Sequence, residues 1–290
     1  MKRVLVVGAT GTVGKPLVER LTAVGAPVRA LVRSPGAATL PEVEIVSGDL
    51  TVPETLGPAL NNVDAVFLVW TVPFNTFPAV LERITRNAQR IVFLSAPLKT
   101  PHPLFQQPNP VRVLTEKLER LIEASGLQWT FLRPGMLAIN AVRWWAGQIR
   151  AGDVIRWPYA SVPTAPIHEQ DIAAVAVRAL CDDGHAGAEH VLTGPQSLTH
   201  AEQISMIGRA IGRPLRMEEI TPEEAGRELS AVMPPFIVTM LMNAWSAAAG
   251  EPAFVTSTVA EITGTPARAF FDWAIDHAAE FQADRGSAGN

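Results

Sequence analysis

The sequence predicts an α/β fold: a doubly wound parallel sheet with a smaller, mainly helical lobe in the C-terminal part. Three observations carry this prediction. The apolar run Val4–Val7 leads directly into a glycine-rich turn and a helix-forming segment. Strand-like and helix-like segments then alternate through the first half, which is the pattern of right-handed crossovers between parallel strands. After Arg133 the pattern becomes mixed and helical segments dominate.

Each element follows from local periodicity and from its flanking residues. Continuous apolar runs bounded by turn residues predict buried strands near Arg3–Val7, Pro27–Val32, Glu44–Ser47, Ala65–Leu68, Arg90–Ser95, Gln128–Arg133 and His190–Leu192. Helical spacing predicts helices over Pro16–Ala23, Pro110–Ser125, Glu169–Cys181, His200–Ile211, Pro222–Val232, Pro235–Ala248 and Pro266–Phe281. Between a strand and a helix, Pro97–Pro110 is rich in proline and glutamine and is predicted to be a mobile polar loop.

The turn that follows the first strand is the strongest functional signal. Glycines let a backbone bend sharply and approach a diphosphate, and the free N–H groups of the next helix favour its charge. The turn Gly8-Ala9-Thr10-Gly11-Thr12-Val13-Gly14 stands between a strand and a helix, so it predicts a dinucleotide site, with an ordinary turn as the alternative. The residues expected to hold the cofactor here are Gly8, Thr10, Gly11, Thr12, Val13 and Gly14.

The end of the second strand favours one nicotinamide cofactor. An acidic residue there binds the ribose 2′-hydroxyl of NAD, whereas an arginine accommodates the 2′-phosphate of NADP. This chain has Val32-Arg33-Ser34 and no carboxylate. Arg33 therefore predicts NADP(H), unless it is only a solvated surface residue.

Composition excludes several classes of protein. The 290 residues carry a net charge of −4, which gives no support to a nucleic-acid-binding surface. Cys181 is the single cysteine, so neither an internal disulfide nor a cysteine-rich zinc site is expected, and no other spacing predicts a metal. No apolar stretch approaches membrane-spanning length. We expect a cytoplasmic monomer or homodimer that acts on a small molecule, without a nucleic-acid or membrane partner.

Three blocks carry a family resemblance. They are the glycine turn, Gly48-Asp49-Leu50, and the stretch from Ser125 to Met136 that is followed by Asn140. Through them the chain resembles the NmrA-like, atypical members of the short-chain dehydrogenase/reductase superfamily. The resemblance implies an NADP(H)-binding Rossmann core over residues 1–134, with segments around 160–194 returning to the sheet. Residues 135–290 would mostly form a substrate-binding lobe that acts as a lid.

The resemblance also implies where the rest of the cofactor lies. Asp49 and Leu50 would flank the adenine, although an aspartate at a strand end also commonly begins a turn. Leu68-Val69-Trp70 would pass under the ribose and the nicotinamide. The far side of the nicotinamide would be lined by Pro134, Gly135 and Met136.

The chain departs from this superfamily at its proton relay. Such enzymes usually carry a Tyr-x-x-x-Lys pair, but the single tyrosine, Tyr159, is followed four positions later by Pro163. Where relatives often place a lysine or histidine, four positions before Glu119, this chain has Thr115. A different helix register would bring Lys117 to the cleft instead. Hydride transfer survives such a loss because acid–base assistance contributes only about 10²–10⁴-fold.

Substitute proton donors can be nominated by position. Ser95 and Thr71 follow the fifth and fourth strands and are expected to point towards the nicotinamide, unless their hydroxyls only satisfy backbone groups. His102, in the polar loop, is nominated because imidazole is a common general acid, with a solvent-exposed loop residue as the alternative.

The substrate pocket is expected to be apolar. Large apolar surface that could enclose a planar or greasy substrate is supplied by Trp144, Trp145, Met233, Phe236, Met240 and Trp245, although such residues also form cores and dimer interfaces. In relatives the segment around His168 borders the pocket, so His168 is a candidate wall residue. The nearby Asp171 is already explained by the helix dipole.

These observations favour an NADPH-dependent reductase of a hydrophobic activated carbonyl, enone or quinone-like molecule. The missing relay keeps a second hypothesis open, namely a non-catalytic NADP(H)-binding redox sensor of the NmrA type. An isomerase or lyase on the same fold is a third, because fold does not fix function.

Overall fold

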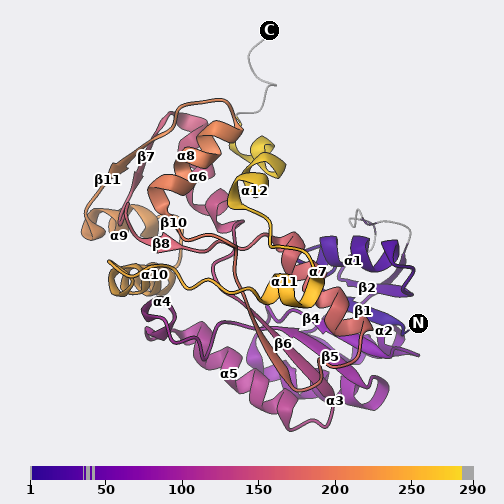
Figure 1. Ribbon diagram of the computed structural model, residues 1–290. Coiled ribbons are helices and arrows are strands. Elements are labelled where there is room, and N and C mark those ends of the chain that lie inside the picture. The colour runs from indigo at the N-terminus through magenta and orange to yellow at the C-terminus, as the bar shows by residue number, and fades with distance from the viewer. Residues whose placement is uncertain (1, 35, 37–39, 41–42, 283–290) are drawn as a thin grey trace.

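A seven-stranded parallel sheet forms the centre of the computed structural model, which describes residues 2–34, 36, 40 and 43–282 (Figure 1). Its order is β3-β2-β1-β4-β5-β6-β9, and every neighbouring pair is parallel. The strands are β1 (Val4–Val7), β2 (Val28–Val32), β3 (Glu44–Ser47), β4 (Ala65–Leu68), β5 (Arg90–Leu94), β6 (Gln128–Pro134) and β9 (Ala188–Leu192). The order reverses between β1 and β4, and ligands of such sheets bind at the carboxyl ends beside this point.

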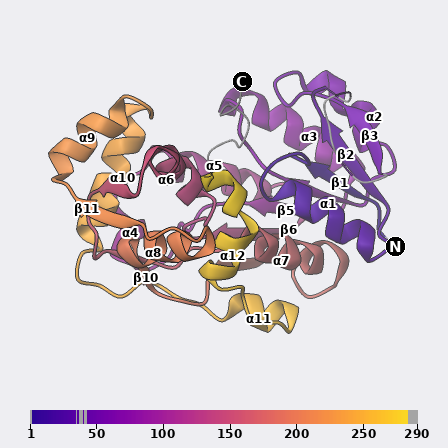
Figure 2. The same cartoon turned by 90° about the horizontal axis from the view of Figure 1, so that it is seen from above.

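Two apolar cores cover the two faces of this sheet. Val4 and Val6 of β1 enter one core and Leu5 and Val7 the other, because successive side chains of a strand point to opposite faces. The first core is covered by α1 (Gly14–Ala23), α7 (Glu169–Cys181) and α11 (Thr258–Thr263), and the second by α2 (Gly57–Leu60), α3 (Phe77–Asn87) and α5 (Pro110–Glu123). Figure 2 shows α1 and α7 on one side of the strands and α2 and α3 on the other.

A third core holds the C-terminal lobe together. Its centre is made of four tryptophans whose side chains are almost wholly buried: Trp145, Trp157, Trp245 and Trp273. The elements around it are α6 (Asn140–Ala151), β7 (Val154–Trp157), β8 (Pro163–Thr164), β10 (Leu198–Thr199), α8 (His200–Ala210), β11 (Arg216–Glu219), α9 (Pro222–Ser230), α10 (Pro235–Ala247), α12 (Phe270–Asp276) and η4 (Ala278–Phe281). The strands of this lobe form two small pairs, β7 with β11 and β8 with β10.

The predicted parallel sheet is confirmed, with all seven predicted strands present. The helix predicted over Pro266–Phe281 is wrong at its start, because α12 begins only at Phe270 and η4 forms a separate turn. The physical reason is a long-range contact: the backbone N–H of Arg268 donates to the Asp171 carboxylate at 2.7 Å, which holds the preceding segment out of a helix. The loop Pro97–Pro110 contains the short helix α4 (Pro103–Gln106), which the sequence had not indicated.

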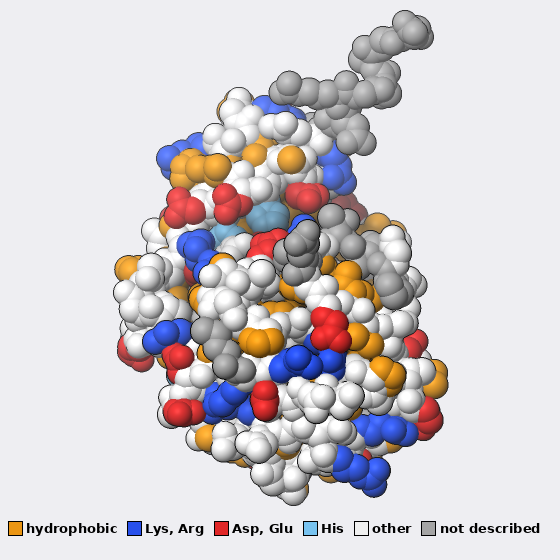
Figure 3. Space-filling view, turned by 90° about the vertical axis from the view of Figure 1, so that its right-hand side faces the viewer, with side chains coloured by type: hydrophobic (Ala, Val, Ile, Leu, Met, Phe, Trp, Pro, Cys, Tyr) orange, Lys and Arg blue, Asp and Glu red, His pale blue; other side chains and the backbone are white. Residues whose placement is uncertain are grey.

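Within residues 2–34, 36, 40 and 43–282, no helix combines the length and apolarity needed to span a bilayer. On the face shown in Figure 3, acidic, basic and apolar side chains are interspersed.

Candidate functional site

The glycine turn after β1 has the tight geometry that the sequence predicted. Gly8 has a φ of +81°, a left-handed conformation that favours glycine, and its carbonyl accepts the N–H of Gly11 at 2.9 Å. A Cβ atom at Gly14 would lie 2.0 Å from the Gly8 carbonyl oxygen, so the turn and the start of α1 can pack this closely only with glycine there.

The first turn of α1 is open to an anion. It has neither a side-chain cap nor an acidic residue, and Thr10 and Gly11 are exposed beside it. Thr12 is half-buried and Val13 points into the core. Because uncapped N–H groups and the positive end of the helix dipole attract phosphate, these residues fit the diphosphate of a dinucleotide.

The ends of β2 and β3 lie side by side and carry the residues expected at the adenosine. Arg33 is exposed directly after β2, and Leu50 is buried. Asp49 accepts the Thr51 N–H and hydroxyl at 2.8 Å each, and these two hydrogen bonds hold the pKa of Asp49 below its ordinary value. Asp49 thus has a local turn role whether or not a nucleotide is bound.

The chain after β4 passes directly over the glycine turn. The Cβ of Val69 would lie 3.3 Å from a Cβ built on Gly8. Trp70 packs edge-on against Phe77, and its indole N–H is buried without a hydrogen-bond partner in the described part of the chain. Thr71 is exposed. The position of Val69 and Trp70 beside the turn agrees with the path expected for the ribose.

A buried ion-pair network that sequence reasoning missed lies at the ends of β5 and β6. Arg133 donates to Glu119 through Nε at 3.0 Å and Nη2 at 2.6 Å, and also pairs with Glu189. Burial opposes the charge of Arg133, but these carboxylates raise its pKa. Ser95 donates its hydroxyl to Glu119 at 2.5 Å, and Glu189 also accepts Lys99 at 2.7 Å. The Ser95 hydroxyl, nominated as a proton donor, therefore already donates its hydrogen to Glu119.

His102 has a structural role and is not the solvent-exposed loop residue that was considered as an alternative. Its side chain is buried; Nδ1 accepts the Leu104 N–H at 3.2 Å as the cap of α4, and Nε2 lies 2.9 Å from the Pro252 carbonyl. Both ring nitrogens are used, which leaves no free proton for a substrate.

The register of α5 places Lys117 on its exposed face. Thr115, Leu118, Glu119 and Ile122 form the buried face of this helix. Thr115, at the position where relatives often carry a lysine or histidine, donates its hydroxyl to Val111. A different register that would bring Lys117 to the cleft is thus excluded.

The single tyrosine lies in the C-terminal lobe. Tyr159 packs beside Trp245, with 6.4 Å between ring centroids, and its carbonyl accepts a hydrogen bond from His200. It belongs to the surroundings of the third core and is not part of a proton relay.

A cavity of about 210 Å³, here called the β6 cavity, opens beside Gly135 and Met136 at the carboxyl end of β6. Its wall comes from the chain after β5, from α4 and the residues around it, from the first turn of α5, from the start of α6, and from α10. It is lined by Ala96, Pro97, Leu98, Leu104, Phe105, Gln107, Asn109, Arg112, Gly135, Met136, Asn140, Met240, Leu241 and Ala244. None of these side chains releases a proton readily at neutral pH.

Of the apolar residues predicted to line the pocket, Met240 lines this cavity, whereas Trp144, Trp145 and Phe236 do not. Trp145 is fully buried in the third core, where it packs edge-to-face against Trp157, and Phe236 is 53% exposed. Trp144 lines a different hollow, with Arg143 and Arg156. These placements correct the prediction, because helical spacing alone does not show which side of α6 or α10 faces the sheet.

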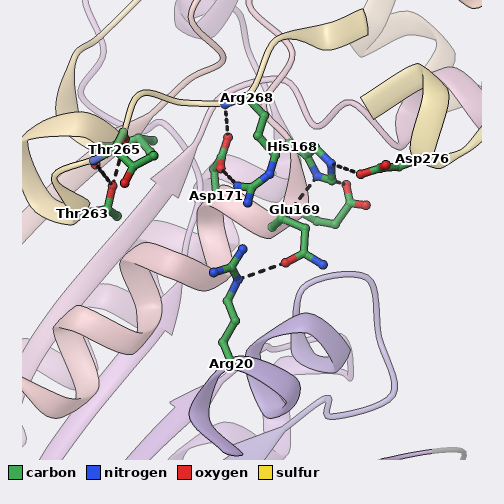
Figure 4. A network of polar contacts seen from close by, with 10 residues as sticks. Arg20, His168, Glu169, Asp171, Thr263, Thr265, Arg268 and Asp276 are labelled. Atoms are coloured by element: carbon green, nitrogen blue, oxygen red, sulfur yellow. Dashed lines mark hydrogen bonds and ion pairs between the residues drawn. The ribbon is translucent and has the colours of Figure 1, made fainter. Parts of the chain in front are cut away.

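His168 belongs to a polar network between α7 and the C-terminal segment and lines none of the hollows described here (Figure 4). It caps α7 through Nδ1 and approaches Asp276 through Nε2 at 3.2 Å. Burial alone would lower its pKa, but contacts with Glu169 and Asp276 raise it. His277 contacts Glu169 at 2.6 Å, and Asp171 pairs with Arg268. The network fastens the C-terminal segment to α7, so the expectation of a pocket wall at His168 is corrected.

No group of three or more histidine, cysteine or acidic side chains within the described ranges is arranged to hold a metal ion.

Comparisons with known proteins agree with this geometry. A family model described as NAD(P)H-binding matches residues 8–183. The chain is 37% identical to the (4-alkanoyl-5-oxo-2,5-dihydrofuran-3-yl)methyl phosphate reductase of Streptomyces griseus over 96% of this chain and 99% of that protein. It is 34% identical to the NAD(P)H azoreductase of Xenophilus azovorans over 97% and 99% of the two chains.

Solved structures share the fold at lower identity. The triphenylmethane reductase of Citrobacter sp., crystallised with NADP(H), superimposes with a TM-score of 0.77 at 18% identity over 95% of this chain and 99% of that one. The chain therefore belongs to the NAD(P)H-binding family, as its resemblance to the NmrA-like, atypical short-chain dehydrogenases/reductases predicted, and it is an NAD(P)-dependent oxidoreductase.

Proposed function

We propose that this protein is an NADPH-dependent reductase that delivers hydride to a small, hydrophobic and chemically activated acceptor such as an enone or a quinone. The observation that carries the proposal is the composition of the β6 cavity. It adjoins Gly135 and Met136, where the nicotinamide is expected, and its walls are apolar apart from amides and one guanidinium.

An acceptor in such a cavity must tolerate the charge that hydride addition creates. The cofactor, when bound, supplies the hydride; the chain supplies orientation and exclusion of water. Because none of the described side chains that line the cavity is a ready acid, a simple ketone would receive no proton from them. A conjugated carbonyl or a quinone delocalises the new charge and takes its proton from water.

NADPH is favoured over NADH by Arg33. Its guanidinium is exposed beside the end of β3, at the position where a 2′-phosphate is expected, and a planar guanidinium binds phosphate in bidentate fashion. Two relatives support the class of acceptor. The Streptomyces griseus reductase is named for a 2,5-dihydrofuranone phosphate, and the Xenophilus azovorans reductase is named for azo compounds.

The test is to follow NADPH oxidation by the purified protein with matched acceptors: a saturated ketone, its α,β-unsaturated counterpart, and a quinone. We expect turnover with the enone or the quinone and at least about 100-fold less with the saturated ketone, the size of a missing general acid. Equal turnover of ketone and enone would contradict the mechanism. Tight NADPH binding without turnover of any acceptor would favour the redox-sensing regulator instead.

A further inference from the structure

Among the residues that the structure describes, Arg112 is the one charged side chain that lines the β6 cavity. It extends from the first turn of α5 and is half-buried. Its Nη1 donates to the Phe105 carbonyl at 3.1 Å. The ring of Phe105 in turn reaches Gly135, since a Cβ atom built there would lie 3.4 Å from Phe105 Cζ. The guanidinium is therefore fixed relative to the end of β6.

The charge of Arg112 is not neutralised by the protein. In the part of the chain that the structure describes, no carboxylate lies within ion-pair distance of Arg112. The neighbouring α10 carries no acidic residue. A half-buried guanidinium normally has an anionic partner, because leaving its charge partly desolvated is costly.

Arg112 also borders a second, open hollow of about 660 Å³ outside the β6 cavity. Leu98, His102 and Gln107 belong to its lining together with Arg112, and Lys99 adds another cation, already paired with Glu189. Within the described part of the chain, no acidic side chain lines either hollow. The boundary between the two is therefore electropositive.

The size of the β6 cavity decides how a substrate would lie. At about 210 Å³ it is smaller than the ~300–1,000 Å³ of most small-molecule pockets, so part of a ligand must extend into the open hollow. Leu104, Met240 and Leu241 favour an apolar portion inside. Any group that extends outward passes Arg112.

We infer that Arg112 is a substrate-binding residue that pairs with an anionic group, a phosphate monoester or a carboxylate, on an otherwise apolar acceptor. The anion lies at the boundary of the two hollows, and the acceptor carbon lies inside the β6 cavity beside Gly135 and Met136. This inference rests on the proposed reductase function and names the substrate class for the same site.

The experiment compares charged and neutral acceptors in wild type and variants. The probes are a 2,5-dihydrofuranone that carries a phosphate ester, the same ring with a carboxylate, and the same ring with a free hydroxyl. In Arg112→Gln we expect KM for one charged probe to rise about tenfold to a hundredfold, the loss expected for a charge-assisted hydrogen bond. The larger effect identifies phosphate or carboxylate. The hydroxyl probe should change by less than about twofold, as should the NADPH Kd.

Two further variants make the result specific. Arg112→Lys keeps the charge but loses the planar fork, so it should restore part of the affinity for the charged probe. Arg120→Ala removes a cation from the exposed face of the same helix, where Arg120 pairs only with Glu116, and should leave every KM unchanged. Equal losses for charged and neutral probes in Arg112→Gln, or no loss for either, would overturn the assignment.

Calorimetric titration of the charged probes into the NADP⁺-saturated protein separates this inference from the proposed function. Binding that Arg112→Gln abolishes, without turnover in wild type, would retain the anion site and reject the reductase. Turnover of the neutral probe together with binding that is insensitive to Arg112 would do the reverse. If Arg112→Gln fails to fold, Arg112→Lys provides the same comparison with a smaller expected shift.

Discussion

The glycine turn after β1 is built from backbone, whereas the β6 cavity is built from side chains of segments far apart in sequence. Gly8, Gly11 and Gly14 lie within one stretch of seven residues, and their spacing alone sets the geometry. The cavity instead needs Met136 from the end of β6, Arg112 from α5 and Met240 from α10. A site made from local backbone can be predicted from a sequence. A site assembled by tertiary packing cannot, because the sequence does not show which distant residues meet.

Replacing Gly14 at the start of α1 should have the largest effect, because it should destroy the glycine turn. The new Cβ in Gly14→Ala would stand 2.0 Å from the Gly8 carbonyl oxygen, so the turn must open. We expect NADPH affinity to fall more than about 100-fold, since the diphosphate site depends on that turn. Fluorescence titration of NADPH measures this.

The matched control is Gly147→Ala in α6. A Cβ there meets nothing within 4 Å, and alanine is the better helix former. Nucleotide affinity should not change. A folded Gly14→Ala protein with unchanged NADPH affinity would show that the turn is not the nucleotide site.

Much of the fold could be predicted because its signals are local. The apolar runs of β1 and β4 are buried on both faces, and α7 begins and ends where its caps and periodicity place it. The start of the last helix could not be predicted, because Asp171 holds the Arg268 backbone from a distance of 97 residues.

The difference between local signals and long-range contacts also explains which residues of the candidate site could be predicted. Trp145 and Trp144 are neighbours on one helix, yet only their tertiary surroundings place the first in the core and the second beside another hollow. His102 was nominated for its chemistry, but the Pro252 carbonyl, 150 residues away, occupies its ring nitrogen. The Arg133 network joins β6, β9, α5 and the segment after β5, and no local pattern marks it.

The network around Glu169 fastens the C-terminal segment to α7, and its loss should be the next largest effect. Burial alone would raise the pKa of Glu169, but contacts with His168 and His277 lower it to about 2. A carboxyl group whose pKa is lowered on folding stabilises the fold at pH values above its ordinary pKa. This stabilisation is lost as the pH falls towards the pKa of the folded state. The shift from 4.5 to about 2 corresponds to about 3 kcal/mol.

Wild-type protein should therefore lose this stability between about pH 4.5 and 2, which denaturant unfolding across pH can follow. Glu169→Gln should be less stable at neutral pH and should lack this part of the acid dependence. Glu123→Gln, at an exposed position of α5, is the control. Identical pH profiles for wild type and Glu169→Gln would mean that the network does not stabilise the contact between α7 and the C-terminal segment.

A smaller effect is expected at Arg33, which tests the proposed contact with the 2′-phosphate. Arg33→Ala should weaken NADPH binding about tenfold, the value of one solvent-exposed charge-assisted contact, and leave NADH binding nearly unchanged. Parallel titrations with the two cofactors provide the control within one variant. Equal losses for both cofactors would reject the assignment of Arg33 to the 2′-phosphate.

The smallest effect is expected at Lys117, the residue that a different helix register would have made catalytic. Its side chain lies on the exposed face of α5, while Thr115 and Glu119 occupy the buried face. Lys117→Ala should change kcat and KM by less than about twofold, as for an ordinary surface substitution. A general acid would instead contribute about 10²–10⁴-fold, so a loss of that size in kcat, with NADPH affinity intact, would restore a lysine to the reaction. An unchanged rate would leave water as the source of the proton, which limits the β6 cavity to acceptors that are already activated.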